Sequence, residues 1–350
     1  LTADDLSFDA TNWASLTGLT LASATDTNRS PDILNLPTGV TVTLNDSDVD
    51  ATTLDTVAGA DITVDAEATG LTSLTITDAE NVTINGEGSA ADLVALALDA
   101  TDTKTLTLTA DGGTALDTGA ITNTDEITTI TATTSKASGT ITVDTIADID
   151  GLTSLNLTAV NANLTTGQLG TDATANNAEL LTNITTVATG TDVVLTTGAL
   201  YADSSSDSTT DLAMTLDITT NVGARNNIGA IDNTYGSITS TIVSNSSNDT
   251  DLGNLTSVAQ THTVSGGGDT DFAAITASGA VTVTSTGSGN LTITDANVDG
   301  TSASLNVDAS GMSGTANVVA TNTSVATTLT GGSGADTLTG GSVADTITGG

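Results

Sequence analysis

The chain has 350 residues, of which 42 are Asp or Glu and only 4 are Lys or Arg, so its formal net charge at pH 7 is −38. So few basic groups cannot neutralise phosphates, which excludes nucleic acid and anionic membranes as electrostatic partners and makes divalent cations the expected counterions. Aromatic residues make up 1% of the chain and cysteine is absent, so a core of large side chains, disulfides and thiolate metal sites are all excluded.

Residues 1–38 are the least repetitive part of the chain and are predicted to form an N-terminal cap, or a junction to preceding sequence. An acidic segment before Phe8 would open a short helix with Phe8, Trp13 and Leu16 along one side. A parallel coil needs such a cap where its first turn would expose a sheet edge. Trp13 is expected to be a buried anchor of this cap rather than a ligand-binding aromatic.

Strand signals follow one another almost without pause over residues 39–330. Aliphatic residues alternate with threonine, as in Val40 to Leu44 and Leu106 to Leu108, and Asn, Asp, Gly and Ser fill the gaps. The spacing of these runs, roughly 8 to 22 residues, is typical of coils with one long or two short strands. Residues 196–260 are the most irregular part and are expected to form a bulge or a lateral contact surface.

This pattern predicts an all-β parallel β-helix, or solenoid, with irregular loops. Small and β-branched residues suit a narrow coil whose interior is filled by aliphatic rows. A string of immunoglobulin-like β-sandwiches is the alternative fold, and the missing core aromatics count against it.

Two acidic clusters in this region are candidate metal sites, namely Asp46, Asp48 and Asp50, and Asp295, Asn297 and Asp299. The first lacks the glycine and the bidentate acid of an EF-hand loop. The second matches the first half of that loop but has Asn306 at the twelfth position. Solvated turns rich in Asp and Asn are the plainer interpretation of both. A third segment, Gly266 to Asp271, resembles a decayed glycine-rich repeat.

No catalytic residue can be assigned from the sequence, and we expect no enzyme. The single histidine, His262, lies on a strand face in Thr-His-Thr-Val and is expected to be structural. With one histidine and no cysteine, no nucleophile and base pair stands out, and Asp is too abundant for its spacing to indicate acid–base roles.

The end of the chain consists of two nine-residue units in one register, GGSGADTLT and GGSVADTIT, and the opening of a third. The pattern G-G-x-G-x-D-x-U-x, in which U is aliphatic, is complete in the first unit, and Val343 replaces the third glycine of the second. Glycine lets the backbone turn with positive φ and brings carbonyl oxygens together, and Asp is a short, hard oxygen ligand. Because one Ca²⁺ takes about 6–8 oxygens, its ligands must come from stacked turns.

The metal-site residues assigned to these repeats are Gly331, Gly332, Gly334, Asp336, Gly340, Gly341 and Asp345. Leu338 and Ile347 are expected to be core, each flanked by outward threonines. A flexible glycine-rich tail is the alternative interpretation of this stretch.

These repeats resemble the RTX (repeats-in-toxin) family of exported bacterial proteins, and the resemblance covers only residues 331–350. It implies a Ca²⁺-binding parallel β-roll there, in which two nonapeptides make one turn. Asp336 would then share its site with a position beyond Gly350, so the chain is expected to be a segment of a longer protein. Composition and layout are similar to those of the RTX-containing surface-layer proteins of Gram-negative bacteria, which implies type I secretion and a place at the cell surface.

On this resemblance we expect an exported structural protein that self-assembles into a calcium-stabilised surface layer or extracellular filament. Its expected partners are copies of itself, with a cell-surface polysaccharide as a further candidate, and no apolar run is long enough to insert into a membrane. An adhesin or biofilm-matrix segment is the first alternative. A polysaccharide lyase or epimerase with an RTX tail is the second, and 4 basic residues in the whole chain argue against it, because such enzymes hold anionic sugars with basic side chains.

Overall fold

The computed structural model describes residues 7–22, 31–46, 51–69, 73–91, 96–98, 102–111, 115–119, 121, 124–137, 139–147, 149–170, 180–202, 212–321 and 323–350. The described residues form strands, turns and irregular segments, and none of them is helical. They contain no helix that is long and apolar enough to cross a membrane. The chain divides into two compact units, one of residues 1–171 and 176–178 and one of residues 172–175 and 179–350.

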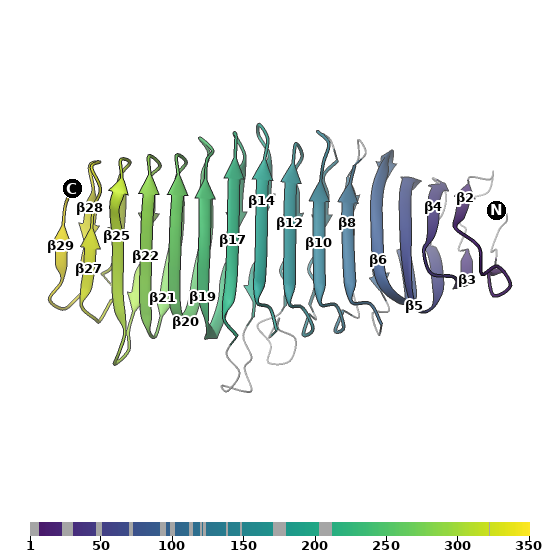
Figure 1. Ribbon diagram of the computed structural model, residues 1–350, viewed down its shortest axis with the longest axis horizontal. Helices are drawn as coiled ribbons and strands as arrows, with labels where there is room; N and C mark the ends of the chain where they lie inside the picture. Colours follow the sequence, from purple (N-terminus) through teal and green to yellow (C-terminus); the bar gives the residue numbers. More distant parts are fainter. Residues whose placement is uncertain are drawn as a thin grey trace. The chain divides into compact units, whose positions relative to one another are not determined.

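The first unit is a parallel β-solenoid, in which strands pair in parallel with strands one turn earlier or later (Figure 1). Its strands are β1 (Ser7–Asp9), β2 (Gly18–Ala22), β3 (Asp32–Leu36), β4 (Val40–Asp46), β5 (Ala51–Thr69), β6 (Ser73–Ala91), β7 (Leu96–Leu98), β8 (Thr105–Ala110), β9 (Leu116–Asp117), β10 (Thr129–Thr134), β11 (Ile141–Val143), β12 (Ser154–Val160) and β13 (Leu164–Thr166). Hydrogen bonds between successive turns, here called rungs, join residues 24 or 25 positions apart in the region of β8, β10 and β12.

The second unit is built in the same way (Figure 1). Its strands are β14 (Asn183–Thr189), β15 (Val194–Thr196), β16 (Leu200–Tyr201), β17 (Met214–Asn221), β18 (Arg225–Ile228), β19 (Ile231–Ser244), β20 (Thr250–Gly266), β21 (Thr270–Ala277), β22 (Ala280–Gly287), β23 (Leu291–Ile293), β24 (Ala296–Val298), β25 (Ser304–Met312), β26 (Ala316–Val319), β27 (Thr327–Thr330), β28 (Thr337–Thr339) and β29 (Thr346–Thr348).

The alternation of aliphatic and polar residues decides which side chains fill the coil. In β8, Leu106 and Leu108 are buried while the threonines beside them are partly exposed. Register then stacks equivalent positions into aliphatic rows, of which one runs through Val40, Ile62, Val82, Leu106, Ile130 and Leu155. Branched aliphatic side chains at a strand spacing of about 4.8 Å fill such a row without large aromatic residues.

The rungs of the second unit become shorter toward its C-terminal end. The rung of β22, β23 and β24 has three strands, whereas β25 and β26 are followed directly by β27 of the next rung. In the last rung Ile347 pairs with Leu329, and the backbone N–H of Thr327 bonds to Asp345, 18 residues later. Two nine-residue repeats therefore span one rung at this end.

Glycines form a column in the turns of the second unit that precede β21, β23, β26 and β28. A Cβ atom at Gly268, Gly289, Gly314 or Gly334 would overlap the carbonyl oxygen of Ser246, Gly268, Gly289 or Gly314, respectively. The glycines thus let successive turns stack in backbone contact. Gly334 of the first nonapeptide belongs to the same column as Gly268 of the decayed repeat.

The predicted all-β parallel solenoid is confirmed, and its parallel pairing excludes the immunoglobulin-like alternative. The helix expected around Phe8 is wrong, because Phe8 lies in β1 and pairs with Ile33 of β3. Trp13 is also not a buried anchor, since it is 56% exposed and contacts the ring of Phe8 edge-on. Within residues 196–260, expected to be irregular, β17 to β20 pair in parallel, with a register shift between Asn233 and Ser237 of β19.

Candidate metal centres

Asp336 and Asp345 hold equivalent positions in the two nonapeptides, directly before β28 and β29. One carboxylate oxygen of Asp336 accepts a hydrogen bond of 2.8 Å from the backbone N–H of Ala316, and one of Asp345 accepts a bond of 3.0 Å from that of Thr327. Ala316 and Thr327 are the first residues of β26 and β27. Each carboxylate therefore caps the start of a strand one rung earlier.

The surroundings of the second carboxylate oxygen of Asp336 indicate whether these residues suit a cation. This Oδ2 atom is buried and has no hydrogen-bond partner among the described residues. It lies so close to Gly331 that a Cβ atom there would overlap it, and Asp345 stands in the same relation to Gly340. A buried carboxylate oxygen without a donor is costly unless a positive charge neutralises it. The buried oxygen of Asp336 is therefore compatible with a bound cation such as Ca²⁺, and Asp345 offers an equivalent carboxylate in the second repeat.

The remaining glycines of the two units bring the backbone of one rung onto the carbonyl oxygens of the rung before. Gly332 lies against the carbonyl of Met312, and Gly341 against that of Thr323. Of the two residues expected to be core, Leu338 is partly buried, but Ile347 is 48% exposed. Among the described residues β29 has a strand on one side only, which leaves Ile347 uncovered.

The two other predicted metal-site clusters lie earlier in the chain. Asp48 and Asp50, with the side chain of Asp46, lie outside the described residues. Asp295, Asn297 and Asp299 do not form an EF-hand loop, because Ala296 and Val298 are buried and pair as a strand with β21. This alternation turns Asn297 outward, so the match to the first half of the loop is a coincidence of strand patterning.

A carboxylate group that was not predicted lies at the start of β20 and on β21; it consists of Asp249, directly before β20, with Asp251 and Asp271, and we call it the acidic group. Asp249 and Asp251 flank the inward Thr250, and Asp271 pairs with Asp251 across the ladder. One ligand oxygen of each lies within 4.8 Å of the others, and within the described ranges this is the one set of three acidic or imidazole side chains with that property. Three such oxygens could contribute to a divalent cation site.

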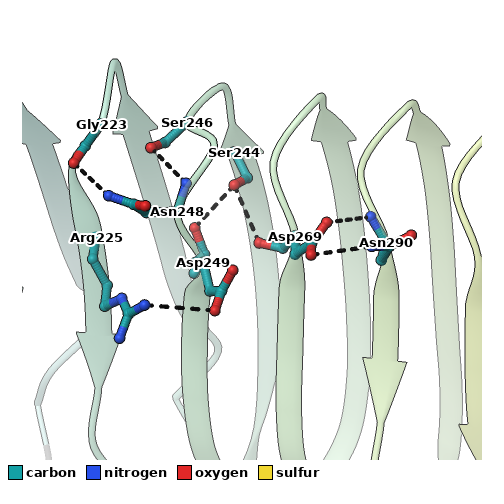
Figure 2. Close-up of polar contacts among 9 residues, drawn as sticks. Gly223, Arg225, Ser244, Ser246, Asn248, Asp249, Asp269 and Asn290 are labelled. Carbon is teal, nitrogen blue, oxygen red and sulfur yellow. Dashed lines mark hydrogen bonds and ion pairs between the residues drawn. The ribbon is translucent and has the colours of Figure 1, made fainter.

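The turn that carries Asp249 is fixed to the rung before it, as Figure 2 shows. The side-chain amide of Asn248 donates to the carbonyl of Gly223 at 2.6 Å, and the guanidinium of Arg225 lies 3.7 Å from the Asp249 carboxylate. On the next rung Asp269 differs, because its two oxygens accept bonds of 2.8 and 3.1 Å from the backbone and side chain of Asn290. Asp269 is thus satisfied within the protein.

Burial, with repulsion between neighbouring carboxylates, raises the pKa of two members of the acidic group. Burial is the main cause that raises the pKa of Asp251, the carboxylates of Asp249 and Asp271 add to it, and Arg225 opposes it. Burial also raises the pKa of Asp271, with Asp249 and Asp269 adding to the effect and a hydrogen bond from Thr292 opposing it. A cation bound here would relieve both effects.

Replacing Asp271 with asparagine is expected to raise the stability of the metal-free protein at pH 7 by roughly 0.5 kcal/mol. A carboxyl whose pKa is raised by folding favours the folded state while protonated, and this contribution is lost as pH rises above the unfolded pKa of about 3.9. Urea denaturation in EDTA measures the change. Asp308→Asn is the matched control of opposite sign, because bonds from Ser310 lower the pKa of Asp308. A loss of stability in Asp271→Asn would contradict the repulsion.

A sequence signal for the acidic group does exist. The triplet Asp-Thr-Asp occurs at residues 249–251 and again at 269–271, each time followed by a large apolar residue. Such a repeat at about one rung length indicates two strands that stack, and thereby places the carboxylates side by side.

Comparison of the chain with protein-family models, with curated proteins and with solved structures gave no match.

Proposed function

We propose that this protein is an exported structural protein that assembles with copies of itself into a calcium-stabilised surface layer or extracellular filament of a Gram-negative bacterium. The observation that supports it best is the buried Oδ2 atom of Asp336, which lacks a donor and lies against Gly331 in a glycine- and aspartate-rich repeat. The resemblance of residues 331–350 to RTX repeats supplies the identity of the cation.

The solenoid and its charge support a structural role. Its interior is filled by side chains, so that β-strand faces, turns and ends are the surfaces available for contacts. A net charge of −38 with 4 basic residues opposes the association of copies unless cations screen or bridge them. Calcium is abundant outside cells, which would restrict assembly to the exported protein.

Calcium would act at the repeats by neutralising carboxylates that folding brings together. Asp336 and Asp345 would each hold part of a calcium site, while Gly331 and Gly340 leave room beside each carboxylate. Because the ion binds the folded rungs and not the unfolded chain, it stabilises them by mass action, by about 2.7 kcal/mol at a free concentration of 100 times Kd.

Removal of calcium is expected to lower the melting temperature and to disperse assemblies. The measurements are thermal unfolding followed by circular dichroism, and electron microscopy of the same samples, in CaCl₂, in MgCl₂ and in EDTA. Ordered sheets or fibres in CaCl₂ support a self-assembling protein, whereas single particles under all conditions favour the adhesin alternative. If EDTA leaves both unfolding and assembly unchanged, the calcium proposal fails.

The Asp336→Asn variant distinguishes calcium binding by Asp336 from its capping of β26. Asparagine retains an oxygen for the backbone N–H of Ala316 but removes the charge. This variant is expected to lose most of the calcium-induced rise in melting temperature while being at least as stable as the wild type in EDTA. Asp217→Asn, which changes an exposed carboxylate on β17, serves as the control and keeps the calcium response. If calcium raises the melting temperature of both variants equally, Asp336 is not a calcium ligand.

A further inference from the structure

A buried polar layer that contains the histidine lies in the core of the second unit. It consists of Ser240 on β19 and of Gln260 and His262 on β20, all of which are at most 1% exposed. In the stacked rows Ser240 and His262 stand between Leu216 of β17 and Val283 of β22. Three inward positions of two neighbouring strands thus carry hydrogen-bonding side chains here.

The hydrogen bonds of the layer fix one form of the imidazole. The side-chain nitrogen of Gln260 donates to the carbonyls of Leu255 and Thr276, at 3.0 Å each, so its oxygen faces His262 Nε2 at 2.9 Å. An amide oxygen only accepts, so Nε2 carries the proton. Nδ1 is then the acceptor for the hydroxyl of Ser240, at 2.7 Å. Both ring nitrogens are satisfied in the neutral ring.

No charged group faces the imidazole from the elements that contact it. β19 presents Ser240, β22 presents Val283 in the adjacent row, and β21 presents the ring of Phe272, whose centroid lies 5.0 Å from that of His262. Asp271, beside Phe272, belongs to the outward acidic group. Burial without a counter-charge lowers the pKa of His262 to about 4.

We infer that this layer makes the second unit acid-labile. A proton added at Nδ1 of His262 breaks the hydrogen bond that Nδ1 accepts from the hydroxyl of Ser240 and leaves a buried, uncompensated charge, so that β19 to β22 open. The direction follows from linkage. The unfolded chain takes up the proton near pH 6.5, above the folded protein, so the contribution of the neutral ring is complete above pH 6.5 and is lost as pH falls toward 4.

Nuclear magnetic resonance of the wild-type chain gives the first test. Because the chain has 1 His, histidine labelled with ¹³C and ¹⁵N gives one set of imidazole signals. The expected result is the Nε2–H form at pH 7.5 and no titration of the folded protein down to pH 5. An imidazole that titrates near pH 6.5 in the folded state overturns the inference.

Hydrogen exchange followed by mass spectrometry gives the second test, with His262→Gln as the comparison. Glutamine offers one acceptor and one donor, as the neutral ring does, but cannot be protonated in this range. With EDTA throughout, local opening of β19 to β22 in the wild type, relative to the variant at the same pH, is expected to increase by up to tenfold for each pH unit below 6.5. Equal pH dependence in both proteins overturns the inference. Should the variant fail to fold, the titration of the wild-type histidine decides alone.

Discussion

Replacing Phe272 with alanine is expected to destabilise the second unit by about 3–5 kcal/mol, the range for deleting a large aromatic side chain from a packed core. Phe272 is 0% exposed and lies in a row between Leu252 of β20 and Ile293 of β23. It also packs against the buried ring of His262. Rungs held at the ladder spacing cannot move together to fill the space, so most of the cavity should remain. Urea denaturation followed by circular dichroism measures the loss.

The matched control is Tyr235→Ala, which removes an aromatic side chain of β19 that is 37% exposed. Less apolar surface is returned to water at this position, so a loss of less than about 1 kcal/mol is expected. Similar losses at Tyr235 and Phe272 would show that the interior is not packed around Phe272.

Alanine in place of Gly289 is the second change with a large expected effect. The added Cβ would overlap the carbonyl oxygen of Gly268, which is backbone and cannot rotate away, so two rungs must separate at this turn. A loss of about 3 kcal/mol is expected, the upper end of the usual cost of overpacking. Thermal unfolding measures it, and limited proteolysis should place the new cleavage near this turn.

Gly267→Ala is the control in the neighbouring turn. Its Cβ would meet only the hydroxyl of Ser288, at 3.2 Å, and that side chain can turn away. A change within about 0.5 kcal/mol is expected. Equal stability of the Gly267 and Gly289 variants would contradict the close stacking of the glycine column.

The fold was predictable because strand patterning is local. Thr105 to Ala110 shows the alternation within six residues, and the same alternation recurs in rung after rung. The helix expected around Phe8 failed because a few apolar residues along one side of a short segment also fit a strand followed by turns, and only the pairing of β1 with β3 decides between them.

The sites were predictable only where a motif fixes the register. The nonapeptides place Asp336 and Asp345 in equivalent turns by their spacing alone. That Asp336 caps Ala316, 20 residues earlier, depends on the length of the intervening rung, which no motif gives. The acidic group depends in the same way on the pairing of Asp251 with Asp271, which the repeated Asp-Thr-Asp triplet indicates but no motif fixes.

The rungs of this solenoid differ in length, and this bears on which insertions and deletions in the sequence the fold can accommodate. A single inserted residue within a strand would turn every later side chain of that strand to the opposite face. A whole inserted rung would leave all faces unchanged, and rungs whose partners lie 25 or 18 residues apart both occur in this chain. The protein can therefore be lengthened or shortened in steps of one rung, each adding about 4.8 Å, without redesign of its interior.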